Sequence, residues 1–263
     1  NGAPAMSSIL RMLSHRSAAI ARNFGAKAAS YDDHADLQRT VAARLARLLP
    51  PLRSPRVLEL GCGTGVFSRH LAERYPDGEL ILTDLAPAMV EQCRRNLGSV
   101  ANARLGFEVM DAARPSVRGP YDLIATSMTL HWLADPEAVL ARLGRLLAPG
   151  GALIYASIGP DSFAEWHAVL KARGLPRGLP ELPSLPGIVD EDRLAVDAGT
   201  LAFLRRIKSI GGLTPRAGYT PLSPGALRGA IRATDAQHDG RVTWHIVYGC
   251  VEASQSSPSM RPA

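Results

Sequence analysis

Short apolar runs and amphipathic stretches alternate along the middle of the chain. The apolar runs predict strands at 56–63, 79–85, 105–111, 121–128 and 152–159. The intervening stretches repeat apolar residues every three or four positions and predict helices at 66–75, 87–97 and 136–147, the last ending at APGG (148–151). Near-continuous apolar strands separated by helices indicate a parallel sheet covered on both faces. The pattern therefore predicts a doubly wound α/β core over 50–160.

The pattern changes beyond this core. Residues 174–187 place a proline at nearly every third or fourth position, which predicts a loop. Further elements are then expected, with strands at 192–197 and 242–251 and helices at 200–210 and 224–234. We expect a helical insert over 161–241, a closing strand over 242–253 and a disordered polar tail over 254–263.

Residues 6–49 are expected to form an N-terminal helical arm. Between Met6 and Ser30 the chain carries four Arg or Lys residues and no acidic residue. This composition resembles that of a transit peptide, but we favour a basic amphipathic helix that packs one apolar face on the protein.

Composition excludes several classes of protein. With 46% hydrophobic residues the chain is not wholly disordered, and no apolar run approaches the roughly 18 residues that a membrane span needs. Its 3 cysteines are too few and too scattered for a disulfide framework or a cysteine zinc site. No metal site is expected, and the interpretation is a cytoplasmic protein without membrane insertion.

The charge balance is basic, with 30 Lys and Arg against 24 Asp and Glu and a net charge of +6. Most of these cations are arginines. Either a GC-rich genome or a basic face that attracts an acidic partner explains them. Aromatic residues make up only 5% and are not interleaved with basic ones, which argues against a stacking platform for single-stranded nucleic acid.

A glycine-rich loop follows the first predicted strand and opens the next helix. It contains Gly61, Gly63 and Gly65, with Glu59 two positions before the first glycine. Glycines allow a sharp turn and a close approach of the backbone to a ligand, with a helix N-terminus behind it. A dinucleotide-binding loop would place its third glycine one position later, where Val66 stands.

Acidic residues also end the next two predicted strands. Asp84 stands nineteen residues beyond Gly65, and Asp111 is followed by Ala112. The carboxyl ends of parallel strands meet at one edge of the sheet, where ligands bind in this class of fold. A carboxylate at the second strand can hold both hydroxyls of a ribose, and one at the third can accept a hydrogen bond from an adenine amino group.

This order of motifs resembles the class I S-adenosylmethionine-dependent methyltransferases. The resemblance implies that Glu59 serves the methionine amino end, that the three glycines pass beneath the ligand, and that Asp84 binds the ribose. It also implies a wider set of cofactor neighbours, namely Gln38, Leu85, Asp111, Ala112 and Ser127.

Three further segments are similar to the malonyl-acyl-carrier-protein O-methyltransferases of biotin synthesis, the BioC family. They are NFGAKAASYDDHADLQRTVAARL (23–45), SMTLHWLADPEAVLARLGRLLAPGG (127–151) and TWHIVYG (243–249). The resemblance implies a seven-stranded Rossmann-like sheet with an N-terminal arm and a substrate-lid insert. It further implies S-adenosyl-L-methionine as cofactor, S-adenosyl-L-homocysteine as product, and an acidic acyl carrier protein bearing the malonyl substrate.

The reaction so implied needs positioning and no general base. A carboxylate is already ionised at pH 7, and methyl transfer from a sulfonium is an in-line displacement. We therefore expect no catalytic residue, but groups that align the substrate and exclude water from it.

Candidate substrate contacts lie in the arm, after the fourth strand and in the insert. Tyr31, His34 and Gln38 are spaced to share one helical face, although Tyr31 and His34 could equally pack the arm on the sheet. The other candidates are His131, Trp132, Arg205, Lys208 and His245. Trp132 could instead belong to the core, His245 could be a structural histidine, and Arg205 and Lys208 could lie on a solvated helix face. The cations would hold the malonyl carboxylate or receive the carrier protein.

Other functions stay open at this point. The insert could accept another small acid, and the LHW stretch also occurs in methyltransferase-fold assembly factors of mitochondrial respiratory complex I. A nucleic-acid methyltransferase is disfavoured, because the Asn/Asp-Pro-Pro-aromatic motif typical of base methylation is absent from 126–129.

Overall fold

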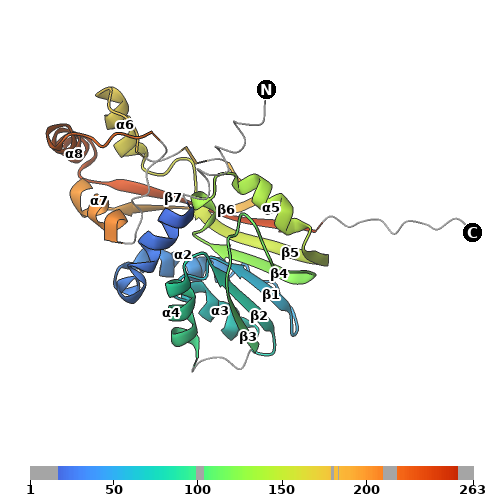
Figure 1. Ribbon diagram of the computed structural model, residues 1–263. Helices are drawn as coiled ribbons and strands as arrows, with labels where there is room; N and C mark the ends of the chain where they lie inside the picture. Colours follow the sequence, from blue (N-terminus) through green and yellow to red (C-terminus); the bar gives the residue numbers. More distant parts are fainter. Residues whose placement is uncertain (1–16, 99–103, 179–180, 183, 210–217, 254–263) are drawn as a thin grey trace, which may run out of the picture.

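The computed structural model describes residues 17–98, 104–178, 181–182, 184–209 and 218–253 (Figure 1). Its seven-stranded sheet has the order β3-β2-β1-β4-β5-β7-β6. The strands are β1 Arg56–Leu60, β2 Glu79–Asp84, β3 Arg104–Val109, β4 Tyr121–Ser127, β5 Leu147–Ile158, β6 Ile188–Val196 and β7 Val242–Glu252. The first five are parallel, and β7 runs antiparallel to both β5 and β6. The predicted doubly wound α/β fold is confirmed.

Helices cover both faces of this sheet. They are α2 Asp36–Ala46, α3 Val66–Arg74, α4 Pro87–Leu97, α5 Pro136–Gly144, α6 Ala164–Ala172, α7 Thr200–Ser209 and α8 Pro224–His238, with 3-10 turns η1 Ala28–Ser30, η2 Asp32–His34 and η3 Leu130–Trp132. Residues 17–25 are also helical. Figure 1 shows α6, α7 and α8 grouped beside the end of the sheet formed by β7 and β6.

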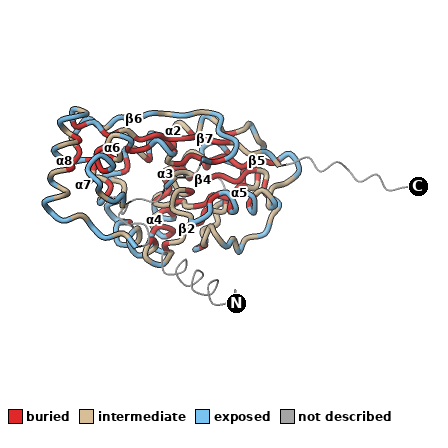
Figure 2. Tube along the Cα trace, turned by 90° about the horizontal axis from the view of Figure 1, so that it is seen from above, coloured by how far each residue is buried: buried red, intermediate tan, exposed pale blue. Residues whose placement is uncertain are grey.

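The alternation of side chains along β1 separates two apolar layers. Val57 lies in one buried cluster with Leu45 of α2 and Leu71 of α3, whereas the next residue, Leu58, lies in a second cluster with Leu140 of α5. The first layer continues under the insert helices. Figure 2 shows the buried residues concentrated along the central strands, while the edge strand β6 alternates between partly covered and exposed positions.

Several predicted boundaries were wrong. The helix predicted over 136–147 ends at Gly144, and β5 already begins at Leu147, so APGG (148–151) lies within the strand. The strand predicted at 192–197 begins at Ile188, because it extends along β7 as an edge strand. Helix α6 was not predicted, although Trp166, Val169 and Leu170 repeat at helical spacing and are buried.

The predicted tail over 254–263 and the arm before residue 17 lie outside the described residues. In the part of the chain that the structure describes, no helix combines the length and the apolar character needed to cross a bilayer.

Candidate active site

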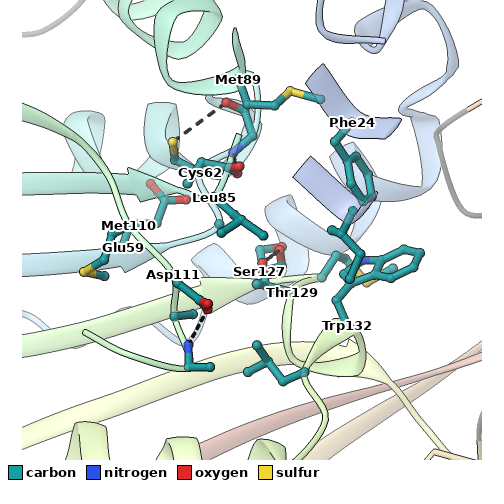
Figure 3. A pocket seen from close by; sticks show the side chains of 18 of the residues that line it. Phe24, Glu59, Cys62, Leu85, Met89, Met110, Asp111, Ser127, Thr129 and Trp132 are labelled. Carbon is teal, nitrogen blue, oxygen red and sulfur yellow. Dashed lines mark hydrogen bonds between the residues drawn. The ribbon is translucent and has the colours of Figure 1, made fainter. Parts of the chain in front are cut away.

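A pocket of about 440 Å³ lies at the carboxyl ends of β1, β2, β3 and β4 (Figure 3). Its walls come from the loops that follow these four strands and from the N-terminal arm. The strand order reverses beside β1, since β2 lies on one side of it and β4 on the other. Such a switch point opens a crevice between loops that turn to opposite faces of the sheet.

The three glycines of the loop after β1 serve different purposes. All have left-handed backbone conformations, with φ of +67° at Gly61, +54° at Gly63 and +96° at Gly65. A Cβ at Gly61 would overlap the Thr129 side chain, whereas one at Gly63 would meet no atom within 4 Å. Gly65 does not line the pocket, and a Cβ there would lie 3.2 Å from the Sγ of Cys93 on α4. Gly63 is therefore the glycine over which a ligand can pass closely.

Asp84, at the end of β2, shapes this loop and also lines the pocket. Its Oδ2 accepts the Gly63 N–H over 3.0 Å, and its Oδ1 accepts the Ala86 N–H over 2.8 Å. Desolvation raises the pKa of the carboxyl, and these backbone bonds oppose that rise. Each carboxylate oxygen retains a further lone pair, so Asp84 can accept additional hydrogen bonds from a ligand.

Glu59 is a buried carboxyl with an unsatisfied atom. The residue is 1% exposed and lines the pocket, and its Oε2 has no hydrogen-bond partner among the described residues. Desolvation raises its pKa to about 8. Gln38 of α2 also lines the pocket and likewise has an unpartnered buried oxygen, Oε1. Two orphaned acceptors in one pocket suit a ligand that carries a cationic or N–H donor group.

The far end of the pocket combines apolar walls with one more carboxylate. The Oδ1 of Asp111 accepts the Ala113 N–H over 2.9 Å. Leu85 and Met110 line the same region, as Figure 3 shows, whereas Met89 lies nearer the arm, in one apolar cluster with Phe24 and Tyr31. Ala112 is also part of this wall. The region suits a flat aromatic ring that carries a hydrogen-bond donor on one edge.

The opposite end of the pocket is aromatic. Phe24 of the arm meets Trp132 of η3 edge to face, with ring centroids 5.2 Å apart (Figure 3). The ring centroid of Tyr31 lies 6.3 Å from that of Phe24. Ser127, the last residue of β4, lines this end too. Burial and the nearby charges of Asp84 and Asp32 raise the pKa of the Tyr31 phenol. Tyr31 therefore stays protonated and can donate a hydrogen bond.

The arm does not present the predicted single helical face. Tyr31 precedes the 3-10 turn η2, which ends at His34, and Ala35 breaks the helical geometry before α2 with φ −93° and ψ +26°. As a result Tyr31 and Gln38 line the pocket, whereas His34 is exposed and does not.

His131 precedes Trp132 in η3 and does not line the pocket. Its ring packs against that of Trp132 at 5.0 Å, and its Nδ1 is buried without a partner among the described residues. Desolvation lowers its pKa to about 3, so the imidazole is neutral at physiological pH. His131 therefore contacts Trp132 without entering the pocket.

The remaining candidates lie away from the pocket. His245 of β7 is 4% exposed, its Nε2 is 3.1 Å from the Oε2 of Glu191, and its Nδ1 accepts the Asp161 N–H over 3.3 Å. It thereby joins β6 and the segment after β5 to the last strand. Arg205 and Lys208 are exposed on α7 and do not line the pocket.

Some pocket residues were missed at the sequence level. Phe24 and Thr64 line the pocket, and Thr64 is tied to Asp32 of the arm. Asp32 belongs to the YDDHADLQR motif, which was the available signal. Among the described lining residues the cations are Arg114 and Arg142, at the Asp111 end. No group of three or more described His, Cys, Asp or Glu residues is arranged to hold a metal ion.

Comparisons with known proteins agree with this geometry. A family described as "Methyltransferase domain" matches residues 58–153. The chain is 36% identical over 251 residues to the malonyl-[acyl-carrier protein] O-methyltransferase of Magnetococcus marinus, covering 89% of this chain and 92% of that protein. It is 41% identical over 244 residues to the biotin biosynthesis bifunctional protein BioCD of Bordetella avium, covering 88% of this chain and 51% of that one.

The fold also recurs in solved structures. The YcgJ protein of Bacillus subtilis superposes with a TM-score of 0.53 at 14% identity, covering 81% of this chain and 97% of that one. A Bacillus halodurans structure named as a methyltransferase gives a TM-score of 0.54 at 12% identity, with 81% and 99% covered. Similarity at this level of identity concerns the fold alone.

Proposed function

The chain belongs to the malonyl-[acyl-carrier protein] O-methyltransferase family, and on that premise we propose that it methylates the free carboxylate of a malonyl thioester held by an acyl carrier protein. It is an S-adenosyl-L-methionine-dependent methyltransferase of biotin synthesis. The observation that carries the choice of substrate is the 251-residue similarity, which extends beyond the α/β core into the arm and the insert.

The chemistry of the pocket fits the cofactor. The unpartnered Oε2 of Glu59 would accept from the methionine ammonium, and the cofactor would run over the open side of Gly63. Asp84 would hold the ribose hydroxyls, and Asp111 would accept from the adenine amino group between the walls formed by Leu85 and Met110. When bound, the cofactor supplies an electrophilic methyl group on its sulfonium.

The aromatic end of the pocket would receive the acceptor carboxylate. Phe24, Tyr31 and Trp132 would exclude water, which stabilises a localised carboxylate charge more than the dispersed charge of the transition state. The protonated Tyr31 hydroxyl would orient the carboxylate by donating to it. Because the nucleophile is already ionised, alignment is the main contribution of these residues and no base is involved.

The insert would receive the carrier protein through cations on α7. Arg205 and Lys208 are exposed one helical turn apart. Helices α6, α7 and α8 contain only two acidic residues, and both are engaged within the protein. Glu165 accepts from the N–H and hydroxyl of Thr243, and Asp235 accepts from the Thr200 N–H. An acidic carrier would therefore meet a cationic surface with little compensating negative charge.

Mass spectrometry of malonyl-carrier protein, incubated with the chain and S-adenosyl-L-methionine, tests the proposal. The expected result is a gain of one methyl group that mild base removes, and no gain on acetyl-carrier protein, which lacks a free carboxylate. Cofactor binding is measured in parallel by calorimetry. Binding without methylation would indicate another small acid as substrate, and absence of binding would favour an assembly-factor role.

A further inference from the structure

Asp32 ties the arm to the glycine loop and to α4 at once. Its Oδ1 accepts the hydroxyl of Thr64, and its Oδ2 accepts the Asn96 Nδ2–H over 3.3 Å. The same Asn96 amide donates to the Thr64 carbonyl over 2.8 Å. Three segments distant in the chain thus meet in one closed hydrogen-bonded group, which we call the clasp (Asp32, Thr64 and Asn96).

The clasp lies beside the pocket. Thr64 is 2% exposed and lines the pocket, next to Gly63. On the arm, Asp32 directly follows Tyr31, which also lines the pocket. Hydrogen bonds to an ionised carboxylate are stronger than neutral ones, and partial burial limits competition from water. The clasp can therefore hold Tyr31 at a defined distance from the glycine loop.

A second series of contacts connects the clasp to the insert. Arg39 donates to the Asp32 carbonyl over 2.7 Å and also pairs with Asp36. Asp36 in turn pairs with Arg206 of α7, with Nη2 and Oδ2 3.0 Å apart. These pairs are exposed, so each contributes little by itself. The partly buried clasp is the stronger attachment of this part of the arm.

We infer that Asp32 is a positioning residue, whose carboxylate holds the arm closed over the cofactor pocket and thereby sets the rate at which cofactor and product leave. The inference rests on the placement of the cofactor under "Proposed function". Arm residues 17, 20, 24, 31 and 38 all line the pocket, so an arm released from Thr64 uncovers it. Asp32 itself does not line the pocket, and its action passes through Thr64 and Tyr31.

The test measures S-adenosyl-L-homocysteine binding to the full chain by calorimetry and its dissociation by stopped-flow tryptophan fluorescence. Asp32→Ala and Thr64→Val are each expected to weaken binding about tenfold, mainly through faster dissociation, which is the scale of one charge-assisted hydrogen bond. Asp32→Asn keeps one acceptor for the Thr64 hydroxyl and is expected to lie in between. The double variant should lose less than the sum of the single losses, since both remove the same contact.

Asp33→Ala is the matched control. Asp33 is the neighbouring acid on the same turn, it is exposed, and it does not line the pocket. Its variant should bind and release the product as the wild type does. Trypsin digestion adds a readout of the arm itself, because bound product should protect the sites at Arg22 and Lys27 in the wild type but not in Asp32→Ala.

The outcomes separate the clasp from the pocket. If Asp84→Ala weakens binding but Asp32→Ala and Thr64→Val do not, the proposed role of the clasp is wrong and the placement of the cofactor is supported. If Asp84→Ala has no effect either, the cofactor placement itself is wrong. Additive losses in the double variant would also overturn the clasp. If Asp32→Ala does not fold, the isosteric Thr64→Val variant tests the same hydrogen bond, and its dissociation rate is compared with that of the wild type.

Discussion

The carboxylate of Asp84 accepts the backbone N–H of Gly63 across 3.0 Å, and so joins the end of β2 to the glycine loop that follows β1. Its other oxygen accepts the Ala86 N–H at the start of α4. The acid therefore orders two pocket loops from within, in addition to offering lone pairs to a ligand. Both functions are lost together when the side chain is removed.

Asp84→Ala is expected to weaken cofactor binding by about 1.5–3 kcal/mol, the usual contribution of hydrogen bonds to a charged group. Asp84→Asn should lose less, because its amide oxygen can still accept one backbone N–H. Titration calorimetry with S-adenosyl-L-homocysteine measures both. Asp77→Ala, at an exposed turn before β2, is the control. Wild-type affinity in Asp84→Ala would contradict the ribose assignment.

Glu59 is expected to make the stability of the cofactor-free protein depend on pH. Its pKa is raised to about 8 from an ordinary value of 4.5, so between these values the folded protein holds a proton that the unfolded chain has released. The contribution of Glu59 to the free energy of unfolding is therefore greatest below pH 4.5. It falls as pH rises from 4.5 to 8 and no longer changes above 8. Urea unfolding of the wild type and of Glu59→Gln at pH 5, 6.5 and 8.5 measures the part of the pH dependence of stability that is due to Glu59.

The same carboxyl should couple cofactor binding to proton release. An ammonium group placed beside Glu59 favours its ionised form, so wild-type affinity should increase as pH approaches 8. Glu59→Gln should show weaker binding with no such dependence. Calorimetry in two buffers of different ionisation enthalpy counts the protons released. Equal proton release by the two proteins would exclude Glu59 as the ammonium acceptor.

Gly61→Ala and Gly63→Ala should fail in different ways. Both impose a left-handed conformation on alanine, which costs about 1–2 kcal/mol. At Gly61 the new methyl group also overlaps Thr129, so thermal denaturation should show the larger loss of stability there. At Gly63 the methyl group enters open space, so the protein should fold but bind the cofactor poorly. Normal cofactor affinity in Gly63→Ala would argue against a ligand above this glycine.

Reversing the charges of Arg205 and Lys208 should raise the KM for malonyl-carrier protein without changing cofactor affinity. The effect should be greatest at low salt, because these side chains are exposed and screening weakens their attraction for an acidic partner. Arg53→Glu, at an exposed position before β1 and outside the insert, is the matched control. If the KM for malonyl-carrier protein has the same salt dependence in the wild type, the charge-reversal variant and Arg53→Glu, α7 is not part of the docking surface.

The core was predictable because its signals are local. Apolar runs located β2 and β4 to within one residue and the start of β1, whose end was placed three residues too late, since buried parallel strands have few polar positions. Edge strand β6 was predicted with a late start and helix α6 was not predicted, because half-exposed elements carry weaker patterns. The orientation of the arm side chains could not be predicted from their spacing, because Ala35 interrupts the helical geometry. Tyr31 and Gln38 therefore line the pocket, whereas His34 faces solvent.

The sequence by itself determined the order of the core elements, the glycine loop, and the pocket positions of Glu59, Asp84 and Asp111. It could do so because the carboxyl ends of adjacent parallel strands must share one edge. Only the tertiary structure decided how the arm and insert dock. That step brings Asp32 to a threonine 32 residues away and buries His245 beside Glu191, outside the pocket. Such contacts depend on the packing of distant elements, for which no short-range pattern exists.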